Sequence, residues 1–254
     1  MWPGWCSAAE PATVPWLHPS GGLVYHGRAW RWRRTLWAAF HDQVRRWLTD
    51  WRPAARPLVL VGPSGGYALT NQFLERFAPI TVLEPDPLAR RILARRFPEH
   101  AFAWRSGERL ARAGGFRWLA DSHPDAAFLF CNLLGQLPQG AGAGFDRRAW
   151  LSELEPALSG RAWASWHDVA STDRPPDRHD ALSLAGALPL DAVLAHYWRG
   201  GELAIHDHGC DGLCPARPRA YALWPLRPGR WHLVEWLACR GSGGEDRPQA
   251  QAAA

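Results

Sequence analysis

Short apolar runs alternate with segments of helical spacing along most of the chain. Five runs have the length and apolar content of buried strands, at 58–61, 80–83, 101–104, 126–131 and 161–169. Apolar residues at helical spacing predict helices between and after them, at 67–77, 87–97, 108–122, 145–158 and 188–198. The third helix is expected to break at Gly114-Gly115. Strands that alternate with helices predict an α/β fold built on a parallel sheet.

The C-terminal part of this pattern is different. Two further apolar runs, 221–226 and 231–239, are joined by Arg227-Pro228-Gly229, which predicts a tight turn in an antiparallel hairpin. We therefore expect residues 57–240 to form one α/β domain. Its core is a doubly wound, mostly parallel seven-stranded sheet with helices on both faces and a C-terminal antiparallel hairpin.

The segments outside this domain have other compositions. Residues 1–24 are rich in Pro, Trp and Gly and predict an irregular arm, whereas 241–254 predict a disordered tail. Between arm and domain, 26–56 carries eight arginines and two aspartates, with apolar residues at helical spacing up to Pro53. This basic amphipathic helix completes an N-terminal unit, 1–56. A packing helix is favoured, while nucleic-acid contact, membrane-surface binding and a substrate lid stay open.

A glycine turn follows the first predicted strand. Its sequence is Gly62-Pro63-Ser64-Gly65-Gly66, and the second strand ends in Glu84. Glycines let a backbone approach a ligand closely at a helix N-terminus, and an acid at the next strand end accepts hydrogen bonds from ribose hydroxyls. The pair indicates a nucleotide-containing cofactor. The gaps do not match the dinucleotide fingerprint G-x-G-x-x-G.

The same stretch resembles the first motif of the class I S-adenosylmethionine-dependent methyltransferases, which places Gly62 and Gly66 on the outer glycines and Ser64 on the middle one. On this resemblance the chain is a bacterial-type member with S-adenosyl-L-methionine as cofactor, and Glu84 is the ribose acid. The predicted cofactor-binding residues are Gly62, Pro63, Ser64, Gly65, Gly66, Glu84, Pro85, Asn132 and Leu133. Three positions depart from the family pattern: Leu60, Ser64 and Arg105.

Two strand ends carry candidate chemistry. The fourth strand opens into Asn132, Leu133 and Gly135, and it resembles the family strand whose end lies beside the transferred methyl group. The fifth ends in His167-Asp168, an imidazole and an acid that could take a proton from a nucleophile. Neighbouring strand residues point to opposite faces, so both serve one site only if the strand has ended. His167 and Asp168 are the predicted catalytic residues.

A loop near the C-terminus gathers polar side chains as His206, Asp207, His208, Cys210 and Cys214. Two imidazoles and two thiols are ligands that zinc accepts, but the spacing differs from the usual knuckles, and we expect no metal. A surface loop is the simplest interpretation. The alternative is a substrate-side loop in which Asp207 and His208 face the pocket with Gly135.

The composition excludes several enzyme classes. All 29 basic residues are arginine. A P-loop, a pyridoxal Schiff base, a kinase and a short-chain dehydrogenase each need a lysine, so none of these sites can exist here. The fourth strand also lacks an N-P-P-Y-type sequence, the mark of amino-methylating nucleic-acid enzymes. A small-molecule or protein acceptor is therefore favoured.

The remaining features of the sequence concern the cellular compartment and an alternative function. The five cysteines are scattered, and we found neither a secretory signal nor an apolar run long enough for a membrane span, so a cytoplasmic protein is expected. The alternative function is a catalytically inactive methyltransferase-like binding module. In that case Leu60, Ser64 and Arg105 record lost cofactor contacts, and the basic helix contacts RNA.

Overall fold

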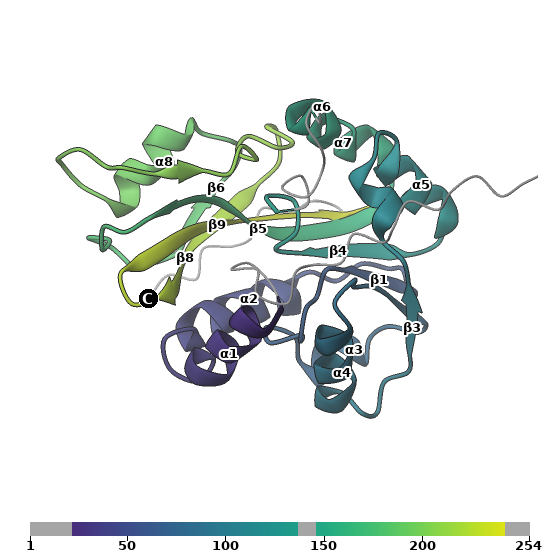
Figure 1. Cartoon of the computed structure of the whole chain (residues 1–254). Helices are drawn as coiled ribbons and strands as arrows, with labels where there is room; N and C mark the ends of the chain where they lie inside the picture. The colour runs from purple at the N-terminus through teal and green to yellow at the C-terminus, as the bar shows by residue number, and fades with distance from the viewer. Residues whose placement is uncertain (1–21, 137–145, 242–254) are drawn as a thin grey trace, which may run out of the picture.

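The computed structural model describes residues 22–136 and 146–241 (Figure 1). Most of the arm expected at 1–24 and nearly all of the tail expected at 241–254 lie outside these ranges. Within them the chain forms one mixed sheet between two layers of helices, which is the α/β architecture that the sequence predicts.

The sheet has a parallel half and an antiparallel half. In spatial order its strands are β3 (Phe102–Arg105), β2 (Ile80–Leu83), β1 (Leu58–Val61), β4 (Ala127–Cys131), β5 (Ala162–Thr172), β9 (Arg230–Arg240), β8 (Arg219–Arg227) and β6 (Leu182–Leu184). The short β7 (His206–Asp207) pairs with the end of β5. The pairs from β3 to β5 are parallel, and the remaining pairs are antiparallel. The doubly wound sheet with a closing hairpin is confirmed. The sheet has nine strands and not the seven expected, because the sequence missed β6 and β7.

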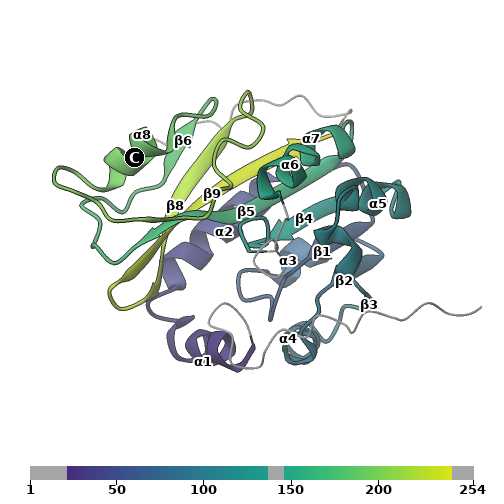
Figure 2. The same ribbon diagram turned by 45° about the horizontal axis from the view of Figure 1, so that its top comes forward.

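Helices cover both faces of the sheet (Figure 2). One face carries α1 (Gly22–Trp32), α2 (Ala38–Asp50), α3 (Asn71–Leu74) and α4 (Pro87–Arg96). The other carries the 3-10 turn η1 (Glu108–Ala111), α5 (Gly115–Ser122), α6 (Arg147–Ser152), α7 (Leu154–Ala157) and α8 (Leu190–Tyr197). The expected break at Gly114 is confirmed, since this glycine has a φ of 71°.

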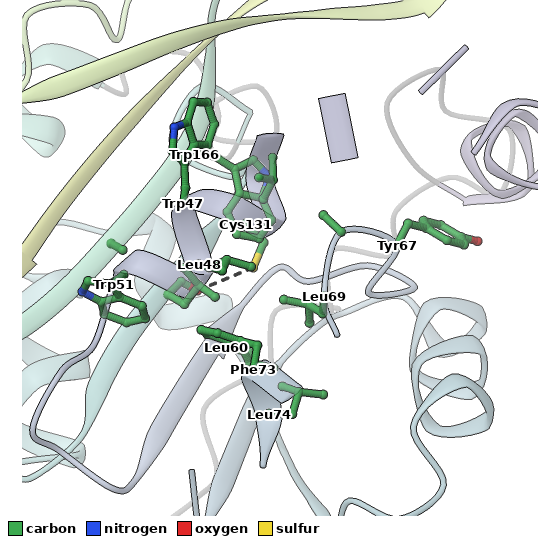
Figure 3. Close-up of a cluster of buried hydrophobic side chains, with 14 of the residues drawn as sticks. Trp47, Leu48, Trp51, Leu60, Tyr67, Leu69, Phe73, Leu74, Cys131 and Trp166 are labelled. Atoms are coloured by element: carbon green, nitrogen blue, oxygen red, sulfur yellow. Dashed lines mark hydrogen bonds between the residues drawn. The ribbon is translucent and has the colours of Figure 1, made fainter. Parts of the chain in front are cut away.

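The two layers enclose two hydrophobic cores, because alternate residues of each strand face opposite sides. Leu60 of β1 contributes to the core under α2, together with Trp47, Trp51 and Phe73 (Figure 3). Val61, its neighbour, contributes to the core under the α5 face. Strands buried on both sides therefore read as continuous apolar runs, which is why the sequence predicts them well.

The basic segment forms two helices, α1 and α2, joined by a turn. The apolar side of α2 is buried in the first core. Two indoles fix the segment to the antiparallel hairpin: Trp37 Nε1 donates to the carbonyl of Leu226 at 3.1 Å, and Trp51 Nε1 to that of Cys239 at 3.2 Å. These contacts support the interpretation of the basic segment as a packing element of the fold.

Two expected helices differ from the structure. The one expected at 67–77 shrinks to α3 because the Thr70 hydroxyl accepts from the N–H of Phe73 and caps a helix that begins only at Asn71. The one expected at 145–158 begins at Arg147 and divides into α6 and α7 at Glu153, and its first residue lies outside the described ranges.

Candidate functional site

The glycine turn leaves β1 at the carboxyl edge of the parallel strands. Gly62, Ser64 and Gly66 have φ values of 64°, 51° and 65°, in the left-handed region. A Cβ on Gly62 would lie 2.8 Å from Leu133 Cδ1, and one on Gly66 would lie 2.4 Å from Leu93 Cδ1. Both glycines are thus favoured by conformation, and Gly66 also by packing against the fully buried Leu93. Leu133, a predicted cofactor residue of another strand end, lies against Gly62.

Glu84 closes β2 beside this turn, as the spacing predicted. Its side chain is buried, with 6 % of its surface exposed. Oε2 accepts from the backbone N–H of Ser64 at 2.8 Å, and Oε1 accepts from that of Asp86 at 3.0 Å. Each carboxylate oxygen has two lone pairs, so each can still accept one further hydrogen bond. Pro85 follows and is exposed.

Burial raises the pKa of Glu84 to about 7, although the two backbone donors act in the opposite direction. A carboxyl group that titrates near neutrality is unusual away from functional sites. The turn and this acid fit the ribose of a nucleotide-containing cofactor: the backbone is close-packed without side chains at Gly62 and Gly66, and two acceptor lone pairs remain on Glu84.

Helix α1 is fixed beside the glycine turn by His26, which is buried. His26 Nδ1 lies 2.8 Å from the Tyr67 hydroxyl, and Nε2 lies 3.3 Å from Asp86 Oδ2. Asp86 also caps α4 by accepting from the N–H of Leu88. Tyr25 packs on Tyr67 at 6.0 Å between ring centroids. Burial raises the pKa of the Tyr25 phenol, and Tyr67, Asp168 and Glu84 add to the effect, so its hydroxyl lies within electrostatic reach of the ends of β2 and β5.

Asn132 and Asp168 join the ends of β4 and β5. Asn132 Oδ1 accepts from the backbone N–H of Asp168 at 3.0 Å, and its Nδ2 donates to Asp168 Oδ2 at 3.4 Å. Asn132 has a φ of 53°, a conformation that asparagine tolerates better than most residues. The amide therefore orients the acid.

A dyad of Asp168 and His232 lies at this edge. His232 Nδ1 is 2.9 Å from Asp168 Oδ2, and Asp168 is almost fully buried. Ser171 lies on the same face because the β5–β9 pairing shifts register between Asp168 and Ala170. The Ser171 hydroxyl is 3.2 Å from Nε2 of His208, whose ring centroid lies 5.7 Å from that of His232. We call Asp168, His232 and His208 the polar cluster.

Charge within the polar cluster is set by Asp168. Burial alone raises its pKa, but His232, His208 and Asn132 together lower it by more, so the net pKa lies below the ordinary value. Asp168 is thus a carboxylate at neutral pH. Its Oδ1 is buried and has no hydrogen-bond partner among the residues that the structure describes. Burial lowers the pKa of His208 to about 4, so this imidazole is neutral.

The structure does not bring His167 together with Asp168. The strand continues to Thr172, so the two side chains point to opposite faces. His167 is fully buried beneath the α8 face, where its Nδ1 lies 3.0 Å from the Ser165 hydroxyl and its Nε2 lies 3.2 Å from Glu235 Oε2. Glu235 also accepts from Arg219 at 2.5 Å and from Tyr221 at 2.7 Å. This is a buried structural network away from the glycine turn.

The loop at 206–214 contributes one predicted residue, His208, to the polar cluster. Gly135 packs so closely that a Cβ would lie 2.8 Å from the carbonyl of Asp168 and 3.6 Å from His208 Cβ. Asp207 is exposed and accepts from the N–H of Gly209. Cys210 Sγ donates to the carbonyl of Asp168 at 2.9 Å. Within the described ranges no group of His, Cys, Asp and Glu side chains has the arrangement of a metal site.

A cavity of about 400 Å³ opens next to the polar cluster, beyond the end of β5. Its lining includes Ser171, Glu202, His206 and Arg230. Arg230 Nη2 donates to the Ser171 hydroxyl at 2.7 Å. The cavity therefore shares Ser171 with His208.

Sequence reasoning missed His232, Tyr25 and His26. His232 lies within an alternating strand, where nothing local separates it from an ordinary strand residue. Its role depends on pairing with a strand more than sixty residues earlier. Tyr25 and His26 lie in a segment whose arginines and tryptophans dominate the pattern. The packing of α1 against α4 and the contacts of both residues with Tyr67 bring them to the site.

The chain was compared with known proteins. No protein-family model matches it, and no curated protein matches it. The N-methyltransferase NodS from Bradyrhizobium japonicum WM9, solved with S-adenosyl-L-homocysteine, is 13% identical over 79% of this chain and 86% of its own, at a TM-score of 0.37. CalS10, an amino pentose methyltransferase from Micromonospora echinaspora solved with S-adenosylmethionine, is 16% identical over 85% and 76%, at 0.35.

A third similar structure is of another kind. It is described as one of the Zn-dependent alcohol dehydrogenases from Rhodobacter sphaeroides and is 14% identical, with a TM-score of 0.35. The match covers 50% of this chain and 46% of that chain, less than half of its length. With scores this low, these similarities add nothing to the strand order described above.

Proposed function

We propose that this protein transfers the methyl group of S-adenosylmethionine to a small-molecule or protein acceptor. The observation that carries the proposal is the joint geometry of the glycine turn and Glu84, a buried strand-end acid tied to Ser64 and still able to accept two hydrogen bonds. The strand order supports it, because ligands of doubly wound sheets lie outside the carboxyl ends of the parallel strands.

The cofactor would lie along this edge. Gly62 to Gly66 would border its ribose and methionine parts, Glu84 would accept from the ribose hydroxyls, and Leu133 would pack beneath it. When bound, the sulfonium supplies a methyl group that is already activated for in-line transfer. The remaining task of the chain is to orient the acceptor and to take up its proton.

The polar cluster is suited to that task. If Nδ1 of a neutral His232 donates to the Asp168 carboxylate, the lone pair of Nε2 is left to take up an acceptor proton. The adjoining cavity, with Arg230 and Glu202 in its lining, would take a polar acceptor. Asp168 is retained from the sequence as a candidate catalytic residue. His232 replaces His167 in that proposal.

The test is calorimetric titration of the purified protein with S-adenosylmethionine and S-adenosylhomocysteine. We expect saturable binding that weakens by about 10- to 100-fold in Glu84→Ala, equivalent to about 1.4 to 2.7 kcal/mol. Glu153→Ala is a matched control, because Glu153 also accepts from a backbone N–H, that of Gly114, but lies on the α5 face. It should leave the affinity unchanged.

The opposite result has a definite meaning. If neither ligand binds at about millimolar concentration, the enzyme proposal fails, and the inactive binding module becomes the better description. Leu60, Ser64 and Arg105 would then mark the lost contacts.

None of the helices in the described ranges is long and apolar enough to cross a bilayer. The cytoplasmic location stays a prediction.

A further inference from the structure

Four arginines from three elements of the α1–α4 layer lie close enough to influence one another's charge. They are Arg33 and Arg34 in the turn after α1, Arg45 in α2, and Arg96 at the end of α4, and we call them the arginine surface. The guanidinium of Arg96 lies 5.2 Å from the centre of the Tyr67 ring, and Arg45 Nη2 donates to the carbonyl of Tyr67 at 3.3 Å. Arg96 and Arg45 therefore both contact Tyr67.

The positive charges of the arginine surface repel one another. Burial lowers the pKa of Arg96, and the guanidinium groups of Arg33, Arg45 and Arg34 lower it further. Arg45 pairs with Asp42, whose side chain is 56 % exposed. Arg33, Arg34 and Arg96 have no carboxylate partner within the residues that the structure describes. The Nε atoms of Arg45 and Arg96 are buried without a hydrogen-bond partner there.

The helices around the arginine surface do not supply the missing negative charge. Residues 26–56 hold eight arginines and two aspartates, and α4 holds four arginines and no acidic residue. These two segments carry more positive charge than the net +5 of the whole chain. The charge is thus concentrated on one layer, where an anionic partner would relieve the repulsion.

We propose that the arginine surface binds single-stranded RNA through its phosphates. An RNA strand brings one negative charge per nucleotide, so it can neutralise several closely spaced guanidinium groups at once. Trp30, three residues before Arg33, is 80 % exposed and offers a ring on which a base can stack. A membrane surface fits less well, since an amphipathic helix binds bilayers with its apolar side, and that side of α2 is buried in the core.

The inference does not depend on the proposed methyl transfer, because the arginine surface shares no residue with Glu84 or the polar cluster. The test is fluorescence anisotropy with a labelled oligouridine RNA of about 16 nucleotides, titrated between about 50 and 200 mM salt. The triple variant Arg33→Glu, Arg34→Glu, Arg96→Glu should bind at least about tenfold more weakly. Its slope of log affinity against log salt should be shallower by about 2, since each lost contact removes about 0.7.

Two further variants make the test specific. Arg112→Glu, Arg117→Glu, Arg148→Glu changes the same net charge on exposed residues of the opposite layer and should leave binding nearly unchanged. Arg33→Gln, Arg34→Gln spares the Arg96–Tyr67 contact and should still reduce the slope. Circular dichroism checks folding. The proposal is overturned if both triple variants lose affinity equally, if the unchanged protein does not bind at the lowest salt, or if it binds phosphatidylserine vesicles but not RNA.

Discussion

The carboxylate of Glu84 accepts a hydrogen bond from the backbone N–H of Ser64 at 2.8 Å, which ties the end of β2 to the turn after β1. Ser64 itself has a φ of 51°, in the left-handed region. The donor is a backbone N–H, so the contact between the turn and its acid does not depend on the side chain at this position.

Cofactor affinity should depend on pH through Glu84. Burial raises its pKa to about 7, and ribose hydroxyls donate to the ionised form. Affinity for S-adenosylhomocysteine should therefore be constant well above pH 7 and fall up to about tenfold per pH unit below it. Titration calorimetry across this range measures the dependence. Glu84→Gln should give a weak, pH-independent affinity, and a wild-type affinity that stays constant between about pH 8 and 6 would contradict the assignment.

Gly66 should be far less tolerant of substitution than Gly212, although both have positive φ, 65° and 70°. An alanine Cβ at Gly66 would overlap Leu93, whereas nothing lies within 4 Å of a Cβ at Gly212. Gly212→Ala should cost about 1 to 2 kcal/mol of strain. Gly66→Ala should add about 1 to 3 kcal/mol for overpacking. Urea unfolding of both variants gives the comparison, and equal losses would mean that the turn relaxes freely.

The buried pair of Arg219 and Glu235 should respond strongly to loss of one partner. Both side chains are fully buried, so Glu235→Gln should cost about 3 to 5 kcal/mol of unfolding free energy. The partly exposed pair of Arg217 and Glu155 is the control, where Glu155→Gln should cost less than about 1 kcal/mol. The double variant Arg219→Met, Glu235→Leu should lose less unfolding free energy than the sum of the losses in Arg219→Met and in Glu235→Leu measured separately. An additive double variant would show that the pair is not coupled.

Acid should destabilise the fold through His41, which is buried against Trp37 and Phe40. Burial lowers its pKa to about 4, aided by the positive charges of Arg45 and Arg96 and opposed by Asp42. The unfolded chain protonates this histidine first, so stability should fall as pH drops from about 6.5 toward 4. Unfolding free energies measured across this range should fall less steeply in His41→Phe. Parallel curves for the two proteins would exclude His41 as a cause.

The fold was predictable because most of its strands are recognisable in the sequence as short apolar runs. The central parallel strands β1 and β4 are buried on both faces and are therefore apolar runs, as Leu58 to Val61 shows. The short strands β6 and β7 lack that signal, since their residues are half-buried or exposed. These two strands form by pairing with β8 and β5, and no local sequence pattern predicts that pairing.

The site was predictable only where it is local in sequence. Gly62 and Glu84 belong to one strand–turn–helix–strand unit, so their spacing alone places them together. Asp168 and His232 meet through the β5–β9 pairing. His167 was a reasonable candidate until the length of β5 was known. Since the strand runs on to Thr172, alternation turns His167 away from Asp168.

The position of β9 has a consequence for biosynthesis. This strand is the last of the sheet to be translated, yet it lies between β5 and β8. Until it emerges, β5 has an unpaired edge, and Arg219 and His167 lack the carboxylate of Glu235. The parallel half can form earlier because its pairings are complete by β5. The growing chain therefore exposes a strand edge until β9 is made, and in that interval it should be most dependent on chaperones and most prone to aggregate.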